Sequence, residues 1–175
     1  QLLDAGLMHK DVSTVAGQGL HAYTREPYLH EQQLRWRDVP SATQNSSILR
    51  EISDPFATHS GLHVLAGNLG RAIVKTSAVH EAFWSIKAPA RVFDTEAQVL
   101  AAYDAGTLVG DLVLVLRFQG PAANGMPELH KLMPLLANLQ SNGQKVALVT
   151  DGRLSGASGK VLAAIHVTPE ASKGG

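Results

Sequence analysis

A short apolar run that opens into a loop of small and polar residues constrains the fold of this chain more than any other feature. Val146 to Val149 is a continuous aliphatic run, which is typical of a strand buried on both faces of a sheet. The run stops at Thr150-Asp151-Gly152, where Asp can hydrogen-bond its own backbone and Gly accepts a positive φ. The following loop carries Arg153 and Ser155 among glycines. In α/β proteins, binding sites lie in loops of this kind, after the carboxyl ends of buried strands.

The end of this loop, Ala157 to Lys160, is similar to the last part of a phosphate-binding P-loop. That motif needs a glycine five residues before Gly159 and a Ser or Thr after the lysine. Leu154 and Val161 occupy these two positions. We therefore reject the P-loop interpretation.

A second strand precedes the first one, and a helix connects the two. Residues 112–118 form an apolar run, and a loop rich in Gly, Pro and Asn follows it. Leucines at helical spacing predict a helix that begins at Pro127 and that Pro134 bends or breaks. A strand–helix–strand unit predicts parallel strands with a right-handed crossover. The loops after both strands, which carry Glu128 and Ser155, are then expected to share one crevice.

The sequence as a whole predicts a mixed α/β domain with helices outside a sheet. Thr95 and Gln98 have the spacing of a capping box at the start of a helix, and Gly106 is expected to end that helix. The expected strands cover residues 62–77, 90–93, 112–118, 145–149 and 163–167.

Composition excludes several classes of protein. The 175 residues are 45% hydrophobic, which is enough for one sizeable core. Fifteen Lys and Arg balance 15 Asp and Glu without a charge run, so neither a nucleic-acid partner nor an electrostatic membrane anchor is expected. No apolar run approaches the length of a membrane span. The chain has no cysteine, which favours a cytoplasmic location.

Long motifs occupy the loops after the two strands and the end of the chain. Asp151 to Gly156 and His166 to Ala171 resemble the Asp-Gly-Arg-x-Ser-Gly and His-Val-x-Pro-Glu-Ala elements of the family that unites dihydroxy-acid dehydratases and phosphogluconate dehydratases. Gly120 to Glu128 resembles the Gly-Pro…Gly-Met-Pro-Glu loop of the same family. The elements have the expected order and separation, and the resemblance covers almost the whole chain.

This resemblance implies a domain organisation. Residues 20–175 are expected to form the C-terminal domain of a two-domain dehydratase, incomplete at its C-terminus, and residues 1–19 the end of the N-terminal domain with a linker. In the family the C-terminal domain is a barrel-like body that swivels, so the strands are expected to curl toward a barrel. Within the irregular segment 20–61, the aromatic residues Tyr23, Tyr28, Trp36 and Phe56 are expected to pack onto that body.

The resemblance also implies roles for individual residues. Ser155 corresponds to the base that removes the proton next to the substrate carboxylate, and a nearby cation would have to stabilise its alkoxide. Glu128 corresponds to a glutamate that helps to bind Mg²⁺, an ion that prefers oxygen ligands. Ser158 lies where the family often has Ser or Thr near the substrate. Arg153 and Gly156 are further candidate substrate-binding residues, and the Arg153 fork suits a carboxylate or a phosphate.

Three of these residues also have simpler explanations, which the sequence leaves open. Ser155 would be an ordinary turn residue. Glu128 would be a favourable charge at the start of a helix. Arg153 would pair with Asp151 and brace the turn.

The reaction implied by the resemblance is the loss of water from a polyhydroxy acid. Thr150 and the segments 122–124 and 157–160 are similar to the phosphogluconate branch of the family, which converts 6-phospho-D-gluconate to 2-dehydro-3-deoxy-6-phosphogluconate in the Entner–Doudoroff pathway. Family members use Mg²⁺ and an iron–sulfur cluster, whose cysteine ligands would lie outside this chain. The expected partners are a sugar-acid phosphate, the N-terminal domain and a second subunit.

Two other readings remain open. One is a dihydroxy-acid dehydratase of branched-chain amino-acid synthesis. The other is a non-catalytic module that binds anions or supports assembly. Under any of these readings this fragment is expected to be inactive by itself, because it has no thiolate to hold a cluster.

Overall fold

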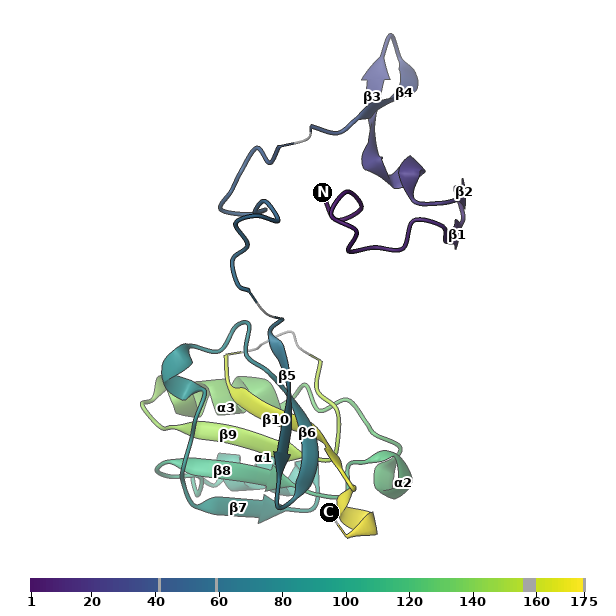
Figure 1. Cartoon of the computed structure of the whole chain (residues 1–175). Helices are drawn as coiled ribbons and strands as arrows, with labels where there is room; N and C mark the ends of the chain where they lie inside the picture. The colour runs from purple at the N-terminus through teal and green to yellow at the C-terminus, as the bar shows by residue number, and fades with distance from the viewer. Residues whose placement is uncertain (41, 59, 156–159, 175) are drawn as a thin grey trace. The chain divides into compact units, whose positions relative to one another are not determined.

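The computed structural model describes residues 1–40, 42–58, 60–155 and 160–174. The chain divides into two compact units, residues 1–59 and residues 60–175 (Figure 1). No helix in the described ranges combines the length and the apolar character that crossing a bilayer requires. The predicted boundary at residue 20 is not tested by this division and stays a prediction.

The second unit is built on one six-stranded sheet. Its strands lie in the order β5-β6-β10-β9-β8-β7. The strands β7 to β10 run parallel to one another, whereas β5 and β6 are antiparallel to each other and β6 is antiparallel to β10. The mixed α/β class is therefore confirmed. The bounds are β5 Leu62–Gly67, β6 Gly70–Lys75, β7 Ala90–Phe93, β8 Leu112–Leu116, β9 Val146–Thr150 and β10 Leu162–Thr168.

The parallel register places three strand ends together. Phe93 at the end of β7 lies opposite Leu116 at the end of β8, which in turn lies opposite Thr150 at the end of β9. Parallel strands that end in register send their following loops out at the same edge of the sheet. The predicted sharing of one edge by the loops after β8 and β9 is confirmed.

Helices cover one face of this sheet and enclose the core. Helices α1 (Glu96–Asp104) and α3 (Leu132–Ser141) pack against each other, α1 also against β7 and α3 against β9. Leu114 of β8 and Leu136 of α3 are fully buried in the resulting cluster. Alternate residues of β8 point into it, which is the period of two expected of a strand. The shorter helices are α2 (Pro121–Asn124) and the 3-10 turns η2 (Glu81–Phe83) and η4 (Ala171–Lys173).

Local signals at the ends of α1 are confirmed. The Thr95 hydroxyl accepts the Gln98 amide at 3.2 Å, and the Gln98 side chain accepts the Thr95 amide at 3.2 Å. Together these contacts form the predicted capping box. Gly106 follows the helix with a φ of 66°, as a glycine at this position commonly does.

The helix predicted from Pro127 begins later, at Leu132. This start makes Pro134 the third residue of α3. The first amides of a helix have no partner within it, so a proline there removes no helical hydrogen bond. Helix α3 runs unbroken through Pro134 to Ser141, so the expected break is wrong; before the helix, Glu128 lies in a β-bridge and His130 and Lys131 form a turn.

The sheet is open rather than closed into a barrel. Strands β5 and β7 lie at its two edges, and in the described residues β7 pairs with β8 only. Figure 1 shows that the sheet twists strongly, with β5 and β6 running across the direction of β7, β8 and β9. The register of β10 shifts between Ile165 and Thr168, where His166 has a φ of 55°. Such an irregularity bends a strand, which turns the β5–β6 hairpin away from the line of the parallel strands.

The first unit consists of turns and two small hairpins. Strands β1 (Ser13–Thr14) and β2 (Gly17–Gln18) pair with each other, as do β3 (Arg25–His30) and β4 (Gln33–Asp38), and the 3-10 turn η1 (His21–Thr24) precedes β3. No described residue of this unit is buried. Tyr23, Trp36 and Phe56 are exposed in this unit, and their expected packing onto the C-terminal body stays a prediction. Of these three residues, Trp36 lies in the β3–β4 ribbon, and a two-stranded ribbon has no second layer of its own.

We expect Leu114→Ala to lower the free energy of unfolding of the 175-residue chain by about 2–5 kcal/mol, because a cavity would remain in the core. Val92→Ala on the edge strand β7, where the side chain is exposed, is the matched control and should cost about 1 kcal/mol or less. Denaturant unfolding followed by circular dichroism measures both. Equal losses for the two variants would contradict the assigned core.

Candidate functional site

A cleft of about 460 Å³ lies at the edge of the sheet where β7 and β8 end. Segments that follow these two strands form its walls, as the parallel register requires. Glu128 is the one predicted site residue among those that line it within the described part of the chain. The complete lining is Asp94, Thr95, Glu96, Phe118, Gln119, Ala123, Asn124, Pro127, Glu128 and Leu129.

The loops after β8 and β9 are joined directly beside this cleft. Glu128 and Arg153 form an isolated parallel β-bridge, and the Leu129 amide donates to the Arg153 carbonyl at 3.3 Å. The Ser155 amide donates to Glu128 Oε1 at 2.7 Å. The structure therefore brings Glu128 and Ser155 into direct contact. Because α3 begins only at Leu132, the alternative that Glu128 is a charge at a helix start is wrong.

Arg153 is oriented by the other loop. Its Nε donates to the Met126 carbonyl oxygen at 2.9 Å. Met126 itself has a positive φ of 56°. The alternative pairing with Asp151 is wrong: among the described residues no ion pair or hydrogen bond joins the Arg153 side chain to that carboxylate, whose two oxygens accept backbone amides. Within residues 60–155 and 160–174, no hydrogen bond or ion pair engages the two Nη groups of the exposed Arg153 side chain. These groups are free to bind an anion.

Asp151 ties three loops together. Its carboxylate accepts the Gln119 amide at 2.8 Å through Oδ1 and the Ala171 amide at 3.0 Å through Oδ2. The residue is 5% exposed. Sequence reasoning placed Asp151 in a turn but missed this contact, because both donors lie far away along the chain. A buried carboxylate needs hydrogen-bond donors. An aspartate directly after a buried strand was therefore the sequence signal that could have indicated such contacts.

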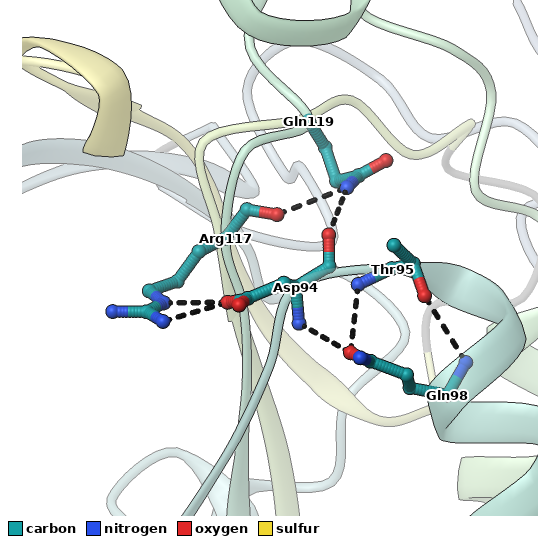
Figure 2. A network of polar contacts seen from close by, with 5 residues as sticks. All are labelled: Asp94, Thr95, Gln98, Arg117 and Gln119. Atoms are coloured by element: carbon teal, nitrogen blue, oxygen red, sulfur yellow. Dashed lines mark hydrogen bonds and ion pairs between the residues drawn. The ribbon is translucent and has the colours of Figure 1, made fainter.

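The wall beneath the cleft is a polar network centred on Gln119 (Figure 2). Its side-chain Nε2 donates to the carbonyls of Asp94 at 3.0 Å and Arg117 at 2.9 Å. Arg117 also pairs with the Asp94 carboxylate, with 2.7 Å between Nη2 and Oδ1. Gln119 is buried, and every polar atom of its side chain has a partner because Asn124 donates to its Oε1. The network links the ends of β7 and β8, and nothing in the sequence motifs pointed to it.

Glu170 holds the start of α2. Its carboxylate accepts the Ala122 amide at 3.1 Å and the Ala123 amide at 3.3 Å. A Cβ on Gly120 would lie 2.3 Å from Glu170 Oε2 and 2.9 Å from Glu170 Cβ, so a larger residue would displace the Glu170 side chain from the place where the two loops meet. Glu170, in the motif at residues 166–171, therefore fixes the loop that contains the motif at residues 120–128.

Two predicted substrate-binding residues, Gly156 and Ser158, lie outside the described residues. Ser155 is described and exposed. Its assignment as a base and that of Arg153 as a substrate ligand stay predictions, since geometry alone tests neither.

Metal ligands are few in the described part of the chain. Residues 1–40, 42–58, 60–155 and 160–174 contain no cluster of three or more His, Cys, Asp or Glu able to hold a metal ion. Glu128 is one of the carboxylates that line the cleft, and its role as a Mg²⁺ ligand stays a prediction. Its Oε1 is held by the Ser155 amide, and its Oε2 accepts no hydrogen bond from the described residues.

Comparisons with known proteins agree with these features. Residues 47–175 match the family model of the dihydroxy-acid/6-phosphogluconate dehydratase C-terminal domain. The whole chain is 58% identical to a phosphogluconate dehydratase of Pseudomonas aeruginosa and 56% identical to one of Escherichia coli K12. It is 36% identical to a dihydroxy-acid dehydratase of Ignicoccus hospitalis. The chain spans 29% of the length of each of these relatives.

We expect Asp151→Asn to lower the free energy of unfolding by about 1–3 kcal/mol, because the amide nitrogen cannot accept and one buried backbone amide loses its partner. Asp104→Asn, at the exposed end of α1, is the control and should change stability by about 0.5 kcal/mol or less. Denaturant unfolding provides the measurement. If both variants are equally stable, Asp151 does not hold the loops together.

Proposed function

Because this chain belongs to the dihydroxy-acid/6-phosphogluconate dehydratase family, we propose that it is the C-terminal part of a hydro-lyase that dehydrates 6-phospho-D-gluconate. The product would be 2-dehydro-3-deoxy-6-phosphogluconate. Identities of 58% and 56% to phosphogluconate dehydratases, against 36% to a dihydroxy-acid dehydratase, support this branch over the other. Dehydration of a branched-chain dihydroxy acid is the second candidate within the family.

The contact between Ser155 and Glu128 is the observation that carries the proposal. A dehydratase of this kind needs a group that removes a proton and a group that holds the cation stabilising the resulting charge. The 2.7 Å hydrogen bond from the Ser155 amide to Glu128 Oε1 supports placing these two roles side by side. It also leaves the Ser155 hydroxyl and Glu128 Oε2 unengaged by any of the described residues.

Ser155 would act as the base. Its Oγ would take the proton from the carbon next to the substrate carboxylate, and the hydroxyl on the following carbon would leave as water once protonated. The resulting enol would tautomerise to the 2-keto-3-deoxy acid. Ser155 is exposed, so a substrate can reach it.

Arg153 would bind a negatively charged group of the substrate. Its Nε is already used by the Met126 carbonyl, which orients the planar guanidinium and leaves its Nη groups for a carboxylate or a phosphate. Gly156 and Ser158 are proposed to complete the substrate contacts from the same loop.

Mg²⁺ and an iron–sulfur cluster are the proposed cofactors, and this chain fits them unequally. Glu128 fits Mg²⁺, which commonly takes one or two protein carboxylates and completes its shell with waters and substrate. The bound ion would stabilise negative charge on the substrate and on Ser155. The chain has no cysteine, so it offers no thiolate to a cluster. Those ligands would come from the rest of the enzyme.

The setting of the enzyme is part of the same proposal. It would be a homodimer of the cytoplasm in which the N-terminal domain of the same polypeptide closes the site. The 175-residue chain would be inactive by itself. A non-catalytic role in anion binding is the alternative from another class, and it would need Arg153 but neither Ser155 nor Glu128.

In the full-length enzyme, Glu128→Gln should weaken Mg²⁺ binding about tenfold or more. The amide oxygen can still accept from the Ser155 amide, so the loops should keep their positions while the charge is lost. Isothermal titration with Mg²⁺ measures the affinity. Glu81→Gln, at an exposed carboxylate in η2, is the control. An unchanged affinity in Glu128→Gln would reject the metal role.

Ser155→Ala in the full-length enzyme should reduce turnover by about 10²–10⁴-fold, the usual cost of losing a proton-transferring group. The backbone amide that binds Glu128 remains, so Mg²⁺ and substrate affinities should not change. Steady-state kinetics and exchange of the substrate proton with solvent are the measurements. Ser85→Ala, at an exposed position, is the control. Retention of more than about a tenth of the wild-type rate would require another base.

A further inference from the structure

The hairpin formed by β3 and β4 has two chemically different faces. Its register pairs Pro27 with Trp36 and Leu29 with Leu34. Side chains alternate along a strand, so these four residues lie together on one face of the ribbon. We call Pro27, Leu29, Leu34 and Trp36 the apolar face.

The opposite face is polar and makes its own contacts. Arg37 pairs with Glu26, with 2.7 Å between Nε and Oε1. The Arg37 guanidinium also lies over the Tyr28 ring, 5.2 Å from its centre. The charged groups named here therefore have partners within the hairpin, and this face can stay in contact with water.

Within the first unit, no described residue covers the apolar face. Leu29 is 77% exposed, Leu34 63% and Trp36 50%. A lone two-stranded hairpin is marginal in water, and a sheet with one apolar face needs a second layer. The described residues of the first unit supply none, because none of them is buried.

The family comparison indicates which body supplies that layer. The C-terminal domain model matches residues 47–175, so the hairpin lies before the recognised domain. The similarity to phosphogluconate dehydratases nevertheless covers all 175 residues, which make up only 29% of those proteins. We infer that the apolar face packs against the N-terminal domain of the full-length enzyme and that the hairpin is an element of that domain. The inference rests on the family and not on the proposed reaction.

The size of the face argues against a second copy as the occupant. Two strands of six residues span about 20 Å by about 10 Å, an area on the order of 200 Å². A stable interface between separate proteins needs about 800 Å² from each partner. A domain on the same polypeptide needs far less, because the covalent link keeps the two surfaces at a high effective concentration.

Hydrogen–deuterium exchange of residues 25–38 tests the inference in two proteins, the full-length enzyme and the 175-residue chain. We expect the hairpin amides of the full-length enzyme to exchange at least about tenfold more slowly, since packing a strand lowers its local opening. The exchange should not depend on protein concentration. Equal exchange in the two proteins would overturn the inference.

A pair of neighbouring substitutions in β4 separates the two faces. Leu34→Gln, on the apolar face, should remove most of the protection in the full-length enzyme. Arg35→Gln, on the polar face, should leave it unchanged. The wild-type comparison needs no variant, so it remains decisive if Leu34→Gln fails to fold. Protection that disappears on dilution together with dimers would identify a second copy as the occupant and reject the N-terminal domain. Protection lost equally in both variants would also reject the assigned face.

Discussion

The buried carboxylate of Asp151 is the contact on which the site depends. It accepts one amide from the loop after β8 and another from the turn after β10, 2.8 and 3.0 Å away. A carboxylate in this position cannot be left without donors, so it draws both segments toward the end of β9. Gln119, which gives one of these amides, also anchors the cleft wall through Asp94 and Arg117. Glu128 and Ser155 meet because the loops that carry them are held in this way.

Under the proposed function, the chemistry would be divided between this chain and the remainder of the enzyme. The chain contributes one carboxylate, one serine and one oriented guanidinium at the edge of a sheet. It has neither cysteines nor a cluster of metal ligands in its described ranges. An arrangement of this kind is expected of a domain that completes a site formed elsewhere. The exposed apolar face of the β3–β4 hairpin agrees with this division, because the first unit has no second layer of its own that covers it.

Features that depend on neighbours in sequence were predicted well. The capping box of Thr95 and Gln98, the turn at Gly106 and the parallel strands β8 and β9 all follow from short-range patterns. The start of α3 was missed because Pro127 is a good first residue of a helix, yet the bridge between Glu128 and Arg153 keeps the chain extended at Glu128, and the helix begins only after the turn at His130 and Lys131. A contact with a distant loop thus outweighed a local preference.

The sequence by itself determined the α/β class and the edge of the sheet at which the loops after β8 and β9 leave it, whereas the cleft at this edge is lined by the segments after β7 and β8. Apolar runs, turn residues and helix caps encode these features within a few positions of one another. Only the tertiary structure decided that Arg153 binds the Met126 carbonyl instead of Asp151, that Glu170 fixes the start of α2, and that the sheet stays open. These outcomes depend on donors and acceptors far apart in sequence. Their pairing is decided by which buried polar groups meet when the strands assemble.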